Sequence, residues 1–114
     1  MRAAFSDTLA RLPGPPSTSY PEGLPFTQAL SDGSMSVELY APGSNADGRD
    51  RQQPHVKDEL YVVVRGQATL HLAGQRLAAQ IGDVLFVPAG AEHRFEPFTP
   101  DFATWVIFYG DPKI

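Results

Sequence analysis

The chain has no cysteine, few lysines and no long apolar run. Without cysteine it can form no disulfide, thiolate metal site or cysteine nucleophile. No apolar stretch approaches the ~20 residues that a helix needs to span a bilayer. The arginines are scattered and the formal net charge is −4, so no continuous basic surface could follow nucleic-acid or lipid phosphates. We therefore expect neither nucleic acid nor a membrane as a partner.

The remaining composition is that of one globular domain. The 114 residues are 42% hydrophobic and 19% charged, which separates the chain from disordered sequences. No basic segment followed by an apolar one opens the sequence, so we see no signal peptide. The expected location is cytoplasmic.

Residues 1–25 differ from the rest of the chain. Phe5, Leu9 and Leu12 have helical spacing, and a proline-rich stretch at 13–16 would end that helix. Residues 13–25 contain five of the eleven prolines and predict an extended arm. We expect this helix and arm to precede a single barrel domain over residues 26–114.

From residue 26 onward the pattern is that of short strands. Apolar and polar residues alternate at 35–40, 67–72 and 102–109, and short apolar runs occur at 60–64 and 84–87. Turn residues separate these segments every eight to twelve positions. Many short strands with almost no helix indicate an all-β sandwich or barrel, and a small barrel can hold one ligand.

Two segments carry residues suited to chemistry. The first is Gln53-x-His55, three residues, Glu59, six residues and Gly66. The second is Gly82, five residues, Pro88-x-Gly90, two residues and His93. In this order and spacing they resemble the two conserved motifs of the cupin family. The resemblance implies a double-stranded β-helix, or jelly-roll, barrel with a metal site inside it.

In this resemblance the metal ligands would be His55, Glu59 and His93, with Gln53 as a fourth. Imidazole and carboxylate ligands without sulfur suit one divalent transition metal such as Fe, Mn, Zn or Ni. Two histidines and one carboxylate also form the facial set of non-haem iron sites. The same residues could instead form a metal-free polar cluster.

The first motif departs from the family pattern because Gln53 replaces the usual first histidine. A glutamine carbonyl is a neutral and weaker ligand than imidazole. Gln53 and His55 are two residues apart, so on a strand they would share one face. Direct ligation by Gln53 and hydrogen bonding to a metal-bound water remain equal alternatives.

Strand periodicity also suggests which residues surround the site. Tyr61 and Val63 share the face of Glu59, and Phe95 shares that of His93. The other candidates for the pocket wall are Phe86, Trp105 and Arg51. Arg51 could present a cation to an anionic substrate, although a solvent-facing arginine is the simpler interpretation.

Two classes of function fit these features. The first is a metalloenzyme acting on a small molecule, of the dioxygenase or isomerase type, in which Glu59 could also accept a proton. The second is a small-molecule or metal-binding module, or a sensor, without turnover. Cupins often form homodimers, so the resemblance also implies a second copy of this chain as a partner.

Overall fold

The computed structural model describes residues 1–45 and 49–113. It contains one short helix, α1 (Phe5–Leu9), and a 3₁₀ turn, η1 (Pro42–Ser44). The eight strands are β1 (Phe26–Asp32), β2 (Met35–Tyr40), β3 (Asp58–Arg65), β4 (Gln67–Leu72), β5 (Gln75–Gln80), β6 (Val84–Val87), β7 (His93–Phe98) and β8 (Ala103–Tyr109). The predicted all-β jelly-roll architecture is confirmed. No helix within the described ranges has the length and apolar character required to cross a bilayer.

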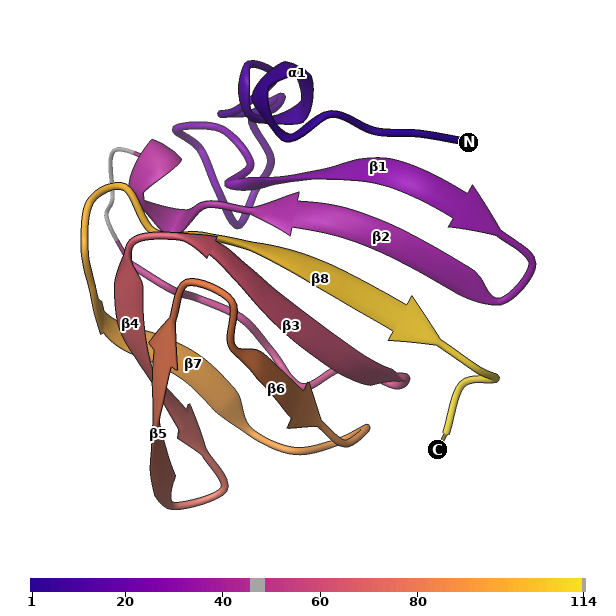
Figure 1. Ribbon diagram of the computed structural model, residues 1–114, viewed down its shortest axis with the longest axis vertical. Coiled ribbons are helices and arrows are strands. Elements are labelled where there is room, and N and C mark those ends of the chain that lie inside the picture. Colours follow the sequence, from indigo (N-terminus) through magenta and orange to yellow (C-terminus); the bar gives the residue numbers. More distant parts are fainter. Residues whose placement is uncertain (46–48, 114) are drawn as a thin grey trace.

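The strands form two antiparallel sheets that face each other (Figure 1). One has the order β1-β2-β8-β3-β6 and the other the order β5-β4-β7. The last strand, β8, lies between β2 and β3, with Glu38 opposite Val106 and Glu59 opposite Phe108. This insertion aligns inward-facing residues of three distant segments on one wall of the barrel.

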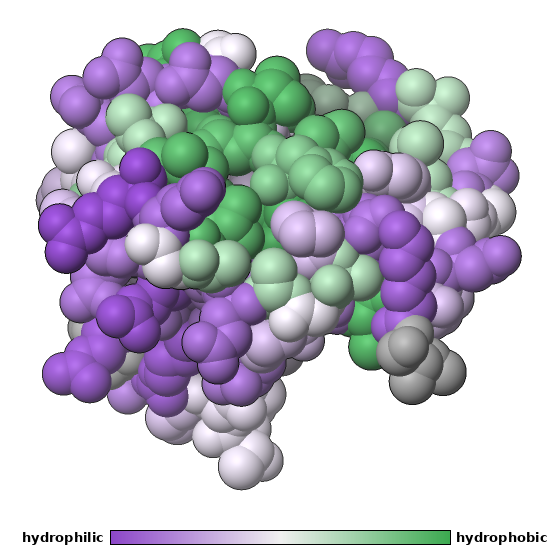
Figure 2. Space-filling model, turned by 90° about the horizontal axis from the view of Figure 1, so that it is seen from below, coloured by the Kyte–Doolittle hydropathy of each residue, from purple (hydrophilic) through white to green (hydrophobic). Residues whose placement is uncertain are grey.

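The outer face of the five-stranded sheet is partly covered by α1. Phe5, Leu9 and Leu12 pack against a small cluster that includes Leu39 and Trp105. Further along the sheet, Val84 is 63% exposed and Phe86 is 47% exposed. Figure 2 shows apolar side chains gathered into one area of the surface, bordered by polar ones.

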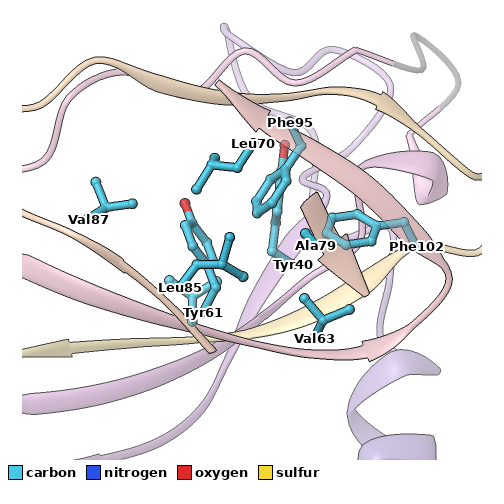
Figure 3. Close-up of a cluster of buried hydrophobic side chains, with 10 residues drawn as sticks. Tyr40, Tyr61, Val63, Leu70, Ala79, Leu85, Val87, Phe95 and Phe102 are labelled. Atoms are coloured by element: carbon cyan, nitrogen blue, oxygen red, sulfur yellow. The ribbon is translucent and has the colours of Figure 1, made fainter. Parts of the chain in front are cut away.

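The core lies between the two sheets. Tyr61, Val63 and Leu85 come from the larger sheet, while Leu70 and Phe95 come from the smaller one, and all are buried (Figure 3). Alternate residues of a strand point to opposite faces, so these positions share one interior. Burying each such side chain contributes ~1.5–3 kcal/mol.

The turn between β3 and β4 requires glycine at position 66. Gly66 has φ = 70°, a left-handed conformation that other residues adopt at a cost. A Cβ atom there would clash with Thr99 Oγ1 and would lie 2.8 Å from the Phe102 Cα atom. The glycine of the first motif thus allows β3 to fold back closely against the chain before β8.

Strand β5 was not anticipated from the sequence. Half of its residues, Gln75 to Gln80, are polar, and Leu77 and Ala79 are its only inward-facing apolar positions. It forms because it pairs along its whole length with β4, from Leu72 opposite Gln75 to Gln67 opposite Gln80. Tertiary hydrogen bonding here outweighs a weak local pattern.

Candidate metal centre

Three side chains from separate parts of the chain meet inside the barrel. His55 precedes β3, Glu59 lies near the start of β3, and His93 begins β7. His93 Nε2 is 2.9 Å from Glu59 Oε1, and His55 Nε2 is 3.9 Å from the same oxygen. One ligand atom from each residue lies within 4.8 Å of the others, so the group has the dimensions to hold a metal ion.

The ring orientation of His93 is fixed by the chain next to it. Its Nδ1 lies 2.9 Å from the carbonyl oxygen of Ala91, so this nitrogen carries the proton and donates it. In a neutral ring the lone pair is then on Nε2, which points toward Glu59. A histidine that donates its second nitrogen to a carbonyl is the usual arrangement for metal ligation.

The cluster also has polar atoms that the protein leaves without hydrogen bonds. These are His55 Nε2, His93 Nε2 and both carboxylate oxygens of Glu59, all buried. The short distance from His93 to Glu59 lacks hydrogen-bond geometry, and a neutral Nε2 with a lone pair cannot donate. Buried polar atoms without partners are costly and rare. A divalent cation would satisfy all four, so the donor set fits a metal.

The two histidines respond differently to this environment. Burial lowers the pKa of His55, and this effect exceeds the opposing influence of Glu59. Burial would also lower the pKa of His93, but the nearby Glu59 carboxylate and the Ala91 carbonyl together outweigh it and raise that pKa. His55, whose side chain is 36% exposed, is therefore the ligand nearer to solvent.

The segment before β3 differs from the expected strand. Residues 49–55 have no regular secondary structure, and Pro54 has no N–H for a ladder. Gln53 is exposed, whereas Gln52 is directed inward and accepts a hydrogen bond from Tyr61 Oη at 2.9 Å. In an irregular segment two residues need not share a face, and Gln53 is more exposed than His55, although both line the pocket described below. Ligation by Gln53 stays a prediction.

The structure distributes the other predicted pocket residues among three environments. Tyr61, Val63 and Phe95 are buried in the core between the two sheets. Phe86 points outward, because Leu85 and Val87 are the inward residues of β6. Trp105 is also on the outer face, with its ring against Phe5 at 6.3 Å. For Phe86 and Trp105 the interior position expected from the sequence is therefore wrong.

Arg51 lies at the surface and contacts the N-terminal arm. Its guanidinium donates to the Ser19 carbonyl at 2.7 Å, lies 3.9 Å from a Glu22 oxygen and sits 5.3 Å from the centre of the Tyr20 ring. These contacts tie the segment that carries His55 to the arm.

A pocket of about 490 Å³ opens beside His55. Its wall includes Glu38 and Tyr40 from β2, Val106 and Phe108 from β8, and Gln52. The Phe108 ring packs against the His55 ring with centres 5.0 Å apart. This volume is in the range of small-molecule sites.

Glu38 is the functional candidate that sequence reasoning missed. It is half-buried on β2, and no ion pair or hydrogen bond of its side chain is found within residues 1–45 and 49–113. Burial, and then the nearby Glu59 carboxylate, raise its pKa. A signal was present, because Glu38 alternates with apolar Val37 and Leu39, whose side chains face the other side of the sheet.

Comparison with known proteins gives the class to which this fold and site belong. The chain matches the Cupin domain family over residues 36–107. It is also 37% identical over 83 residues to the uncharacterised protein SCO3923 of Streptomyces coelicolor, covering 73% of this chain and 77% of that protein. The chain belongs to the cupin family.

Solved structures with this fold include enzymes. One is a chain from the crystal structures of the DMSP lyases RdDddP and RnDddQII, with TM-score 0.61 and 26% identity. The match covers 76% of this chain and 47% of that one, so this chain spans about half its length. A second is the Streptomyces protein PAC13 with uridine, with TM-score 0.59, 22% identity and coverage of 78% and 69%. PAC13 is described as a nucleoside dehydratase.

Proposed function

We propose that this protein is a metal-dependent cupin that binds a small molecule beside a divalent metal and catalyses its isomerisation or elimination. His55, Glu59 and His93 would hold the metal. The observation that carries the proposal is the set of four buried, unpartnered ligand atoms on these three residues. A bound divalent metal supplies a Lewis acid that polarises a carbonyl or similar oxygen of the substrate.

Glu38 supports proton transfer as the reaction type. It is a carboxyl group outside the ligand set, and it lines the same pocket as His55. A raised pKa brings a carboxyl closer to the pH at which it can both accept and donate a proton. Glu38 would take a proton from the substrate and return it to a neighbouring atom or to the leaving group. The similarity to structures of a lyase and a dehydratase agrees with this choice.

The metal site is tested through the three histidines of the chain, of which His71 lies outside the cluster. His71 Nε2 is bound instead to the carbonyl of Glu96 at 2.7 Å. Protein expressed with transition metals is analysed for metal content by mass spectrometry. We expect one metal per chain in the wild type and in His71→Ala, and its loss in His55→Ala and His93→Ala.

Absence of stoichiometric metal from the wild type would contradict the proposal. If metal is present, the loaded protein is incubated with hydroxy acids, sugars and nucleosides while oxygen consumption and product formation are followed. Product without oxygen uptake supports isomerisation or elimination. Oxygen uptake would favour a dioxygenase instead, and ligand binding without product would favour a sensor.

We also propose that the protein forms a homodimer, as the family resemblance implies. Support comes from the outer face of β6, where Val84 and Phe86 are exposed although both are apolar. Strand β6 is at the edge of its sheet, so it is accessible to a second copy. Exposed apolar side chains on one face are typical of an interface between proteins.

A further inference from the structure

The segment that carries His55 has no regular secondary structure to hold this ligand in position. Glu59 and His93 are on strands, but His55 is in an irregular segment that no backbone ladder holds. A metal site needs its ligands fixed within a fraction of an ångström. Side-chain hydrogen bonds must therefore provide what the ladder does not.

Asp50 fastens the segment to β7. Its Oδ2 accepts a hydrogen bond from the backbone N–H of Phe95 at 2.6 Å. Phe95 is two residues from His93, and β7 is an edge strand whose free side is available to this contact. The same carboxylate accepts from the backbone N–H of Gln52 at 3.0 Å and from its Nε2 at 2.8 Å. Asp50 thus joins the His55 segment to the strand of the second histidine.

Gln52 fastens the segment to β3. Its Oε1 accepts the hydrogen bond from Tyr61 Oη, and Tyr61 is two residues from Glu59. A phenol has one O–H group to donate in a hydrogen bond, and in this structure Gln52 Oε1 is its acceptor. The Glu59 oxygens consequently remain without a hydrogen bond and free for a cation.

A third contact acts on His55 itself. The backbone N–H of Gly90 donates to the His55 carbonyl at 2.8 Å, from the turn that leads into β7. These hydrogen bonds join the segment to β3, to β7 and to the turn between β6 and β7, in addition to the contacts of Arg51 with the N-terminal arm. Each of the two strands that carry the other ligands is joined to it by a side chain of the pair Asp50 and Gln52.

We propose that Asp50 and Gln52 are positioning residues that hold His55 in place for metal binding and direct the hydrogen bond of the Tyr61 hydroxyl to Gln52 instead of Glu59. This inference rests on the proposed metal site. Residues that support metal ligands without touching the metal commonly change metal affinity by ~10–100-fold. They hold the ligand side chain in the required direction, so less conformational entropy is lost when the metal binds. Gln52, and not the motif residue Gln53, performs this role.

A distant glutamine offers a matched control for the test. Gln52→Ala removes the bond to Tyr61, and Gln75→Ala removes an exposed glutamine side chain on β5. Zn²⁺ is titrated calorimetrically into metal-free wild type, both alanine variants and Asp50→Asn. Melting of each metal-free protein is measured in parallel. We expect Gln52→Ala and Asp50→Asn to bind Zn²⁺ ~10–100-fold more weakly and Gln75→Ala to bind as the wild type does.

Tyr61→Phe removes the same hydrogen bond by deleting its donor. It removes only the hydroxyl, so the packing of the ring is retained and folding is preserved. If the two groups act through their mutual hydrogen bond, the double variant Gln52→Ala/Tyr61→Phe loses no more affinity than the weaker-binding single variant. Independent, multiplying losses would contradict the proposed pairing.

The possible results distinguish failure of this inference from failure of the proposed metal site. If wild type does not bind Zn²⁺ at all, the proposed function fails. If wild type binds and Gln52→Ala and Asp50→Asn bind equally tightly, the site stands and the positioning role is wrong. Lower melting temperatures with unchanged Zn²⁺ affinity would show a merely structural role and also overturn it. Equal weakening in the control Gln75→Ala would do the same.

Discussion

His93 is held between two acceptors: its Nδ1 lies 2.9 Å from the Ala91 carbonyl, and its Nε2 lies 2.9 Å from Glu59 Oε1. In the metal-free protein the carboxylate of Glu59 favours the positively charged, protonated ring. A metal needs the same Nε2 as a lone pair. Protons and metal therefore compete for one atom of His93.

The first prediction concerns this competition. In the metal-free protein, we expect His93 to titrate above ~6.5 and His55 below it, as followed by NMR of the ring carbons. Zn²⁺ should shift both titrations to lower pH because it binds only the neutral rings. Titration of His55 above His93 would contradict the geometry.

These shifts have opposite effects on the free energy of unfolding. The raised pKa of His93 stabilises the fold below ~6.5, and this contribution is lost as the pH rises through the folded pKa. The lowered pKa of His55 stabilises the fold above ~6.5, and this contribution is lost as the pH falls through its folded value. In metal-free His55→Ala, stability should therefore decline with rising pH more steeply than in the wild type.

A second prediction concerns Glu38→Gln. The raised pKa of Glu38 means that the folded protein disfavours the charged carboxylate, at a cost in stability once the pH exceeds ~4.3. The variant removes this cost, so it should unfold at higher urea concentration than the wild type at pH 8 and gain nothing at pH 4. Glu92→Gln, at an exposed position, is the control and should show no such difference. Metal content should be retained in both.

A third prediction compares two glycines with similar φ. Gly66 (φ = 70°) would bring a Cβ into contact with backbone, whereas Gly74 (φ = 84°) has nothing within 4 Å. Gly74→Ala should cost ~1–2 kcal/mol through backbone strain alone. Gly66→Ala should cost clearly more, measured by chemical denaturation. Equal costs would mean that the Phe102 backbone moves aside freely.

A fourth prediction tests the core beneath the site. The Phe95 ring is fully buried, with centres 4.9 Å from Tyr61 and 4.8 Å from Phe102. Phe95→Ala should destabilise the protein by ~3–5 kcal/mol because it leaves a cavity. Phe95→Leu keeps most of the volume and should cost much less. Similar losses for both variants would indicate that ring geometry, not volume, is decisive.

The fifth prediction addresses the proposed homodimer. Val84→Glu places a charge on the exposed apolar face of β6 and should shift the protein from dimer to monomer in light scattering. Arg76→Glu, on an exposed position of β5 in the other sheet, is the control and should leave the mass unchanged. A wild-type monomer at all concentrations would contradict the proposal.

Much of the site follows from motif spacing. His55, Glu59 and His93 are the three residues that the two motifs single out, and they are the three that the structure brings together. Strand alternation correctly placed Tyr61 and Val63 on the same interior face of β3 as Glu59, because β3 is regular and its side chains alternate. The turn glycine Gly66 was equally visible.

Other features were decided only by the tertiary structure. Periodicity shows that two faces of a strand differ but not which one is interior, so Trp105 was placed inward although α1 covers it on the outer face. Glu38 becomes relevant only because β8 inserts between β2 and β3 and closes the pocket wall. Neither the outward position of Trp105 nor the position of Glu38 in the pocket wall can be predicted from the neighbouring sequence.

The choice between Gln52 and Gln53 shows the same limit at the site itself. By its own pattern the sequence determined the cupin barrel and its three candidate ligands. Which glutamine faces them depends on side-chain bonds to β3 and β7, which are distant in sequence. In a segment without a ladder no periodicity links one residue's direction to the next, so only the folded chain decides it.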